Sequence, residues 1–429
     1  NSLRLTTTRK GLVSVDGFTS ANIRVFDVTE PSAAEELART VAQTAAGYAV
    51  SVSTSSGRTL LALTDDLASQ AASVAANQPS TWHTDGQSAD LVIITHRNLR
   101  DSVAPLKTLR ESQGLHVSVV DVEDLYDEFS YGAHTPQAVR DFLQWTTAHW
   151  QQAPHYVLFV GDATIDPRNY EGHGDFDLVP TKLIDTSALE TASDEWFADF
   201  QDTGVASMAL GRLPVRTAQE AATVISKITN FTPDAVNHTA LFVTDRSGTN
   251  DLDFVAASQT VSAQLPQGTT TTFINRNDGS ADSVRAHVIS EINAGPLVVN
   301  FMGHGSTTFW TGDQLLRNTD AAAFTNGNRL PLFAMMTCLN GYFTGTSVDS
   351  LAEAVLKAQQ GGAVAVWASS GITVPVDQQT VNQELYRQLF NAGPTPTLGD
   401  AVQHAKQATQ DPDIRRTWIL FGDPTMRLR

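Results

Sequence analysis

The sequence has a single cysteine, Cys338, among its 429 residues. One thiol can form no disulfide within the chain, so the fold must be held by its core, and the cysteine count does not decide between an oxidising and a reducing compartment. Long apolar runs are missing too, because no stretch reaches the about 18 consecutive apolar residues that a membrane-spanning helix needs. The sequence therefore predicts no membrane span.

Positive charge is also scarce. Lys and Arg number 28 against 46 Asp and Glu, which gives a net charge of −18 at pH 7. An acidic chain without a basic cluster repels nucleic acid, so we expect no nucleic-acid partner, whereas cationic substrates and calcium are attracted. The chain begins at Asn1 without an initiator Met or a signal peptide, which favours a mature or trimmed chain. Little Lys and much Thr, Ser and Ala favour a secreted or cell-surface protein.

The composition is that of a folded protein with a substantial core. Apolar residues make up 41% of the chain and charged residues 17%, which argues against disorder. The length predicts two or three domains. Apolar and polar side chains alternate at 11–18 and 22–28, so residues 1–88 are interpreted as a small β-sandwich, with strands missing before Asn1, that ends in a polar linker at 77–88.

From residue 89 onward, short apolar runs alternate with amphipathic helices. This rhythm predicts an α/β fold with a mainly parallel sheet. We expect two α/β subdomains side by side, residues 89–232 and residues 233–429, with their boundary near Thr232 and Pro233. The predicted strands are 91–95, 117–120, 156–162, 207–211, 240–245, 297–302, 330–336 and 363–368.

Two of these predicted strands end on reactive side chains. The run at 297–302 leads into Gly303-His304-Gly305, and the run at 330–336 leads through Thr337 to Cys338. Ligands bind at the carboxyl ends of strands in open α/β sheets, so an imidazole and a thiol there can meet and form a thiolate nucleophile. Alone, a buried Cys is most often a small core residue and a lone His a satisfied polar one. Their pairing at two strand ends favours chemistry.

The residues that follow each reactive side chain support this interpretation. Gly305 leaves the main chain after the histidine unencumbered, so that its amide can face a substrate oxygen. Leu339-Asn340-Gly341 is a turn signature that frees the amide at the cysteine.

These motifs resemble those of the gingipain-like cysteine peptidases of the caspase-like clan. The resemblance extends from about Ala89 to Arg429 and includes the sequence Trp-Ile-Leu-Phe-Gly-Asp-Pro at 418–424. It implies a caspase-like three-layer α/β fold with two mainly parallel-sheet subdomains, preceded by the small all-β domain. It also implies a cysteine endopeptidase that needs no cofactor for its chemistry.

The resemblance assigns roles to individual residues. Cys338 would be the nucleophile and His304 the base, and the amides of Gly305 and Cys338 would form the oxyanion hole. In the family an acidic residue well before the histidine holds the ring, and Asp245 stands at that place. The alternative for Asp245 is the cap of a turn before Ser247.

Substrate recognition is predicted from three residues. Asp253 resembles the acid that reads an arginine at P1, the residue before the cleaved bond, and Asp377 lies in a loop where lysine-specific relatives carry an acid. The alternatives are an Asp in a helix first turn for Asp253 and a solvated loop Asp for Asp377. Relatives often carry a small polar residue two positions before the histidine, where this chain has Met302. A Trp of the family also has no match in the loop near Asp377. We expect cleavage after Arg or Lys.

A structural calcium ion is a further expectation. Asp199 and Asp202, with Gly204, crowd one loop with the hard oxygen ligands that Ca²⁺ prefers. Gln201 interrupts the Asp-x-Asp-x-Asp-Gly pattern, and the histidines are too isolated to predict zinc.

The sequence thus predicts a cysteine endopeptidase that acts on proteins or peptides, with an inhibitory propeptide as a further expected partner. Two alternatives stay open. One is a catalytically weak relative that serves in surface binding or in secretion machinery, and the other is a transpeptidase that uses the same two residues.

Overall fold

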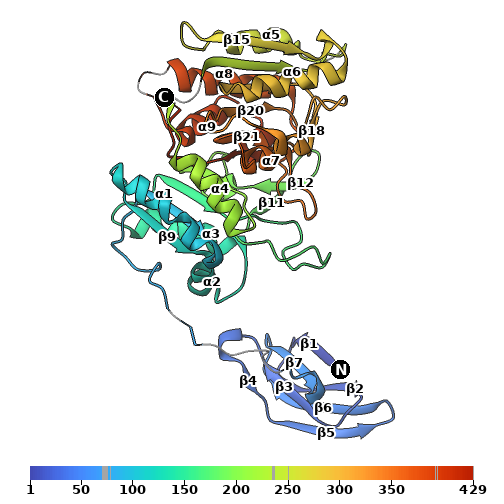
Figure 1. The fold of residues 1–429 in the computed structure, drawn as a ribbon. Coiled ribbons are helices and arrows are strands. Elements are labelled where there is room, and N and C mark those ends of the chain that lie inside the picture. The colour runs from blue at the N-terminus through green and yellow to red at the C-terminus, as the bar shows by residue number, and fades with distance from the viewer. Residues whose placement is uncertain are drawn as a thin grey trace. The chain divides into compact units, whose positions relative to one another are not determined.

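The computed structural model describes residues 1–69, 76–77, 79–233, 237–249, 251–391, 393 and 395–428. The chain forms two compact units, residues 1–78 and residues 79–429, whose elements are labelled in Figure 1. Among the described helices, none has the length and apolarity needed to cross a membrane.

The first unit is a β-sandwich, as predicted. Its two antiparallel sheets share one core, to which Phe18, Val50 and Leu60 contribute. This shared core follows from the alternation of apolar and polar residues, which gives each sheet one buried face. The first sheet has the order β1 (Ser2–Thr6), β7 (Thr59–Thr64), β3 (Ile23–Asp27), β4 (Glu35–Glu36), and the second has the order β2 (Gly11–Phe18), β6 (Gly47–Thr54), β5 (Arg39–Thr44).

The second unit is built on a ten-stranded sheet that contains both predicted subdomains. In the middle strands β16 and β20 every residue is buried, as expected for strands covered on both faces. The strand order is β15 (Thr270–Asn275), β14 (Asn237–Thr244), β16 (Pro296–Met302), β20 (Leu332–Met336), β21 (Ala365–Ser369), β22 (Trp418–Phe421), β13 (Ala209–Leu213), β10 (Tyr156–Val160), β8 (Leu91–Thr95), β9 (Val117–Asp121).

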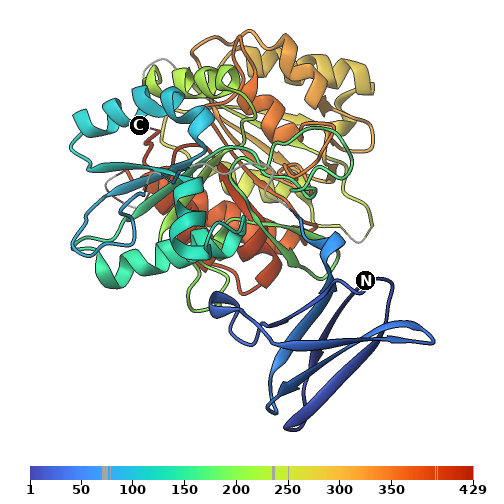
Figure 2. The same ribbon diagram turned by 90° about the horizontal axis from the view of Figure 1, so that it is seen from below.

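Helices cover both faces of this sheet, which gives the predicted three layers (Figure 2). On one face α1, α4 and α7 contact one another in series, and on the other α5, α8 and α9 do so. The helices are α1 (Arg100–Ser112), α2 (Val122–Ser130), α3 (Pro136–His149), α4 (Ala218–Thr229), α5 (Phe254–Ser262), α6 (Ala281–Asn293), α7 (Leu351–Lys357), α8 (Pro375–Asn391), α9 (Leu398–Gln407) and α10 (Pro412–Thr417). Two small antiparallel sheets complete the unit: β11 (Lys182–Asp185) with β12 (Glu190–Ser193), and β17 (Gly305–Ser306), β18 (Phe309–Trp310) and β19 (Leu316–Arg317).

The sheet has two halves that run in opposite directions. All neighbouring strands pair in parallel except β21 and β22, which are antiparallel. The carboxyl ends of β14, β16, β20 and β21 therefore share one edge, and those of β13, β10 and β8 lie on the other. Only the first of these edges carries His304 and Cys338.

The stretch predicted as a linker belongs in part to the second unit. Trp82 packs against Phe142 and Trp150, with 6.4 Å between ring centroids in each case, and its amide donates to Glu128. The compact unit accordingly starts at residue 79 rather than 89. A lone tryptophan in a polar run was the signal for this contact, since burying its ring stabilises the segment on the helices.

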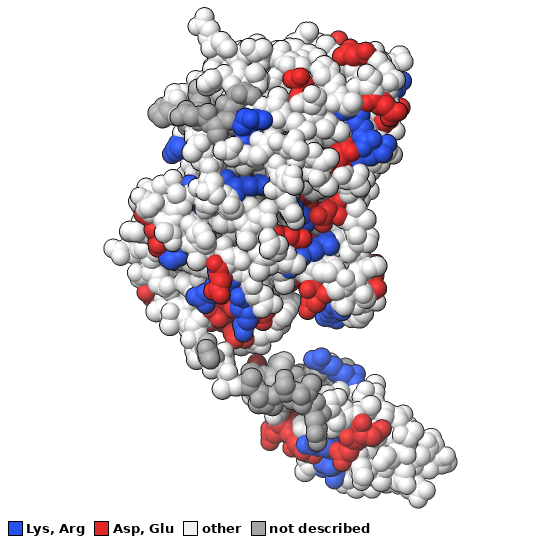
Figure 3. All heavy atoms as spheres, in the orientation of Figure 1, with Lys and Arg blue, Asp and Glu red and all other residues white. Residues whose placement is uncertain are grey.

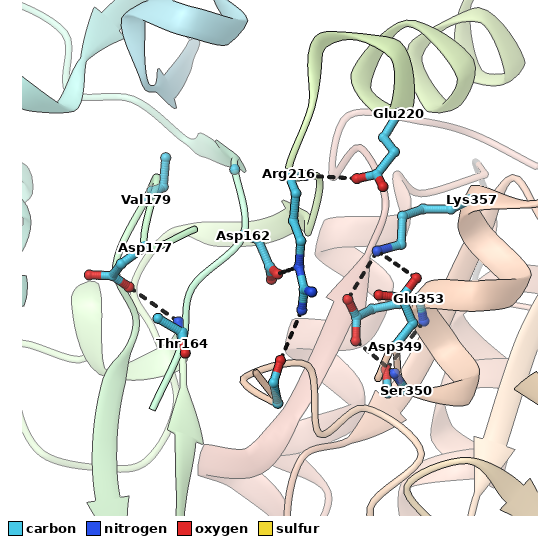
Figure 4. Close-up of polar contacts among 12 residues, drawn as sticks. Asp162, Thr164, Asp177, Val179, Arg216, Glu220, Asp349, Ser350, Glu353 and Lys357 are labelled. Carbon is cyan, nitrogen blue, oxygen red and sulfur yellow. Dashed lines mark hydrogen bonds and ion pairs between the residues drawn. The ribbon is translucent and has the colours of Figure 1, made fainter. Parts of the chain in front are cut away.

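A buried polar network holds the segment after Cys338 against the first half of the sheet (Figure 4). Arg216 follows β13, and its Nε donates to Asp162 at 2.6 Å while Nη2 donates to the carbonyl of Gly345 at 2.9 Å. Asp162 is completely buried, and burial raises the pKa of its carboxyl. On α7, Lys357 contacts Asp349 and Glu353 at 2.9 and 3.2 Å. The segment between Cys338 and α7 is therefore fixed by charged groups.

Asp177 lies beside this network and accepts the amide of Thr164 at 3.2 Å (Figure 4). Burial raises the pKa of Asp177 to about 6. An Asp in an unfolded chain titrates near pH 4, so the folded chain holds an extra proton between about pH 4 and pH 6. Stability from this group is present below that window and is lost as the pH rises through it.

We expect Asp177→Asn to raise the free energy of unfolding by on the order of 2 kcal/mol at pH 8 and to leave it nearly unchanged at pH 4. Urea unfolding from pH 4 to pH 8, followed by tryptophan fluorescence, measures this, because all seven Trp lie in residues 79–429. The exposed Asp175 is the matched control, since Asp175→Asn removes the same charge without a buried carboxyl. A gain independent of pH would contradict the prediction.

Candidate active site

His304 and Cys338 follow the ends of two neighbouring strands in the same register. Met302, the last residue of β16, pairs with Met336, the last residue of β20. His304 and Cys338 each follow two residues later. Adjacent strands lie about 4.8 Å apart, so both side chains leave the sheet at the same edge from neighbouring positions. The two reactive residues that the sequence singles out thus each stand two positions beyond a pair of strand-end partners.

The glycines around His304 are required by close packing. A Cβ at Gly303 would lie 2.4 Å from the Cβ of Asp245, and a Cβ at Gly305 would lie 2.5 Å from the Oγ1 of Thr337. Any larger residue would therefore push the neighbouring chain segments away. Between them the histidine side chain stays accessible, with 57% of it exposed.

Asp245 lies at the end of β14, but its carboxylate contacts the main chain of His304 rather than the ring. One oxygen accepts the amide of His304 at 3.3 Å, and the other accepts the amide of Arg246 at 2.8 Å. Burial raises the pKa of Asp245. In this arrangement Asp245 holds the main chain at His304. The prediction that Asp245 holds the imidazole has no ring contact to support it.

The imidazole is contacted by two residues that the sequence analysis did not assign to it. Its Nε2 lies 3.1 Å from Oδ2 of Asp251, and Phe254 packs edge-to-face on the ring with 5.7 Å between centroids. Asp251 stands in a turn rich in small polar residues, where a carboxylate is ordinary, so no sequence signal distinguished it.

The thiol of Cys338 is largely shielded. Sγ lies 3.5 Å from the amide nitrogen of Thr373, which donates to it, and 3.5 Å from the Thr373 carbonyl, which accepts its S–H. Burial raises the pKa of the Cys338 thiol. The resting group is therefore a neutral thiol at pH 7, and a base is needed to make it a nucleophile.

The turn after the cysteine ties three strand ends together. Leu339 adopts a positive φ of 61°, and its amide donates to Gly371 after β21 at 3.0 Å. Asn340 is completely buried and donates to the carbonyl of Ser306 at 2.6 Å. A Cβ at Gly341 would lie 2.9 Å from the carbonyl of Ala368. Asn340 and Gly341 are thus required for their contacts, whereas Leu339 contributes a main-chain hydrogen bond.

The predicted recognition residues have partners of their own. Asp253 is the exposed N-cap of α5, one position before the first turn that was the alternative for it, and it accepts the amide of Ala256 at 3.0 Å. Asp377 lies in the first turn of α8, not in a loop, and accepts the hydroxyl of Thr409 at 2.6 Å. The loop assignment was wrong because Pro375 opens the helix, as Pro does in first turns.

Met302 is also placed differently from the prediction. Its side chain is 0% exposed in the core beneath the sheet edge, so it cannot touch a substrate in this conformation. Exposed apolar side chains lie instead at Ile372 and Val374, on either side of Thr373, which contacts the thiol. Sequence reasoning missed them because isolated apolar residues in a loop carry no periodic signal.

The residues proposed for calcium do not fit that ion. Both oxygens of Asp199 accept main-chain amides, those of Thr203 and Gly204, at 2.9 and 2.7 Å. Asp202 is exposed and lies 3.7 Å from Arg140. Within the described part of the chain, no three His, Cys, Asp or Glu side chains lie close enough to hold a metal ion. Asp199 instead closes its own loop.

Comparison with known proteins agrees with this fold. The model of peptidase family C25 matches residues 84–429. Gingipain R1 of Porphyromonas gingivalis is 23% identical over 366 residues, which cover 80% of this chain and 34% of that protein. The chain therefore spans about a third of the length of this relative.

Solved structures show the same architecture. The crystal structure of the Arg specific cysteine proteinase gingipain R (RGPB) has a TM-score of 0.67 and 22% identity, over 80% of this chain and 78% of that one. The complex of Porphyromonas gingivalis RgpB pro- and mature domains has a TM-score of 0.66 and 21% identity, over 79% of each chain. Because the family model matches residues 84–429, which are most of this chain, the chain belongs to peptidase family C25.

Proposed function

We propose that this chain is a cysteine endopeptidase with Cys338 as nucleophile and His304 as general base and acid. The observation that carries the proposal is the pairing of Met302 with Met336, which sets the imidazole and the thiol at neighbouring strand ends. Family membership supports the same chemistry.

The reaction follows from what these groups can do. His304 takes the thiol proton while Sγ of Cys338 bonds to the scissile carbonyl carbon, and the histidine then gives that proton to the leaving amine. Water next attacks the thioester with His304 as base, which releases the acid product and the free thiol. The base is essential here because burial raises the pKa of the Cys338 thiol.

Two main-chain amides are suited to stabilise the oxyanion. The amide of Thr311 donates to the His304 carbonyl at 2.8 Å, which makes Gly305 and Trp310 a non-hydrogen-bonded pair of the β17–β18 ladder. The Gly305 amide therefore points away from that ladder. The Cys338 amide has no acceptor within the described chain. Both donors are free for a substrate oxygen, which supports their assignment to the oxyanion hole.

We further propose cleavage after Arg or Lys. The matched gingipain R structure is described as Arg specific, and the net charge of −18 favours cationic substrates. On the face in Figure 3, acidic and basic side chains are interspersed. Asp253 and Asp377 are the candidates, although each now has a structural partner.

An inhibitory propeptide and an exported location complete the proposal. The RgpB complex of pro- and mature domains gives a precedent for a pro-domain bound to this fold. The secreted or cell-surface location rests on composition.

Cys338→Ala should abolish hydrolysis of fluorogenic peptides, because the attacking atom is gone. The melting temperature should stay within about 2 °C of wild type, since Cys to Ala removes little buried volume. Steady-state assays and thermal unfolding of the same preparations measure both. Turnover that survives in the variant would rule out the cysteine mechanism, and a peptide product joined to an added amine would favour transpeptidation.

His304→Ala should lower kcat by about 10²–10⁴-fold, the usual contribution of general acid–base catalysis. It should also slow alkylation of Cys338 by iodoacetamide at pH 7, because the half-buried thiol then has no base. Asp245→Asn should cost less than this, since the amide oxygen can still accept a main-chain N–H. Mass spectrometry reads the alkylation of the single cysteine directly. Alkylation as fast as in wild type would exclude His304 as the base.

A peptide library varied at P1 tests the proposed specificity. We expect Arg or Lys to be preferred by roughly 100-fold or more over neutral residues, because a desolvated carboxylate left unpaired is costly. Asp253→Ala or Asp377→Ala should reduce this preference. A preference for apolar P1 residues would contradict the idea and direct attention to Ile372 and Val374. A basic preference unaffected by either variant would show that another acid reads the substrate.

A further inference from the structure

His304 is contacted by two carboxylates, one at its main chain and one at its ring. Asp245 has both oxygens engaged by main-chain amides, those of His304 and Arg246. The ring nitrogen Nε2 lies 3.1 Å from Oδ2 of Asp251. The acidic residue closest in position to the family pattern thus holds the main chain, and a different one holds the ring.

Asp251 is itself fixed, which a positioning role requires. Its Oδ2 also accepts the amide of Gly248 at 2.7 Å, and a Cβ at Gly248 would lie 2.8 Å from that oxygen. The same turn is closed by the Ser247 hydroxyl, which accepts the amide of Phe254 at 3.1 Å. The Gly248 amide, and then His304, keep the pKa of Asp251 below its usual value, so the carboxylate is ionised at neutral pH.

The position of the ring is further limited by Phe254, the first residue of α5. Its ring lies edge-to-face with the imidazole at 5.7 Å, with an interplanar angle of 87°. Phe254 is completely buried, so it cannot yield easily. With Asp251 on one nitrogen and Phe254 against the ring, rotation of the imidazole is restricted by two independent contacts.

We propose that Asp251 is the positioning residue for the imidazole of His304, and that it accepts the proton on Nε2 so that Nδ1 is the basic nitrogen. An ionised carboxylate has only acceptors, so a hydrogen bond to it requires the N–H on Nε2. The neutral ring then has its lone pair on Nδ1. The kinetic consequence rests on the proposed peptidase function, because only there does Nδ1 take the proton of the Cys338 thiol.

The tautomer can be measured without any catalysis. In full-length chain carrying Cys338→Ala and ¹⁵N-labelled histidine, two-bond ¹H–¹⁵N correlations at pH 8.5 distinguish a protonated Nε2 from a protonated Nδ1. The His304 signals are those absent from a His304→Gln sample. We expect the Nε2–H form, and we expect Asp251→Asn to convert it to a mixture.

The chain offers a matched control for this measurement. His155 Nε2 lies 2.7 Å from Oδ1 of Asp400, an equivalent pair at β10, five strand positions from β16. Asp400→Asn should alter the His155 signals and leave those of His304 unchanged. A His304 with its proton on Nδ1, or one indifferent to Asp251→Asn, would overturn the proposal whether or not the chain proves to be a peptidase.

Kinetics provide the second arm. Asp251→Asn should lower kcat by roughly 10- to 100-fold with little change in KM, because it misplaces a base without touching the substrate. Asp251→Glu should recover most of the loss, since it restores the acceptor. A rise in KM at unchanged kcat would reassign Asp251 to substrate binding and so overturn the positioning role. Loss of activity in Cys338→Ala but not in Asp251→Asn would leave the proposed function standing and refute this inference.

Discussion

The site depends on the parallel pairing of β16 with β20. Because Met302 and Met336 are partners, a shift of one residue would send either the histidine or the cysteine to the other face of the sheet. The two strands are buried along their whole length, so such a shift would also exchange the side chains that pack against the helices on the two faces. The hydrophobic core that stabilises the sheet is therefore also what aligns the imidazole with the thiol.

The two edges of the sheet are used differently. The strand direction reverses between β21 and β22, so one edge carries the carboxyl ends of the second half and the other edge those of the first. At the first edge the strands end on His304 and Cys338. At the other edge the segments after β10 and β13 end on Asp162 and Arg216, whose charges are used for structure. The residues that follow the strand ends are thus the proposed catalytic pair in one half of the sheet and a structural ion pair in the other.

Much of this arrangement could be predicted from the sequence, and the failures have physical causes. Uninterrupted apolar runs predicted the central strands, and Gly-His-Gly with Cys-Leu-Asn-Gly predicted the strand ends. The pairing of β22 with β13 was not predicted, since four residues after a six-residue helix have no periodic signal. The contacts of Asp251 with His304 and of Asn340 with Ser306 were not predicted, because each joins segments about 30 to 50 residues apart in the sequence. Such contacts exist only once the sheet has formed.

The left-handed conformation of Leu339 has a consequence for evolution and engineering of the chain. A residue with a Cβ at positive φ stores strain on the order of 1 kcal/mol next to the proposed nucleophile. Glycine at this position would relieve that strain, so a search for thermostable variants would favour it. The gain would come with a more pliable turn at the thiol, and therefore with a looser attack geometry. The stability that the fold forgoes at residue 339 is a measure of how strictly the cysteine must be held.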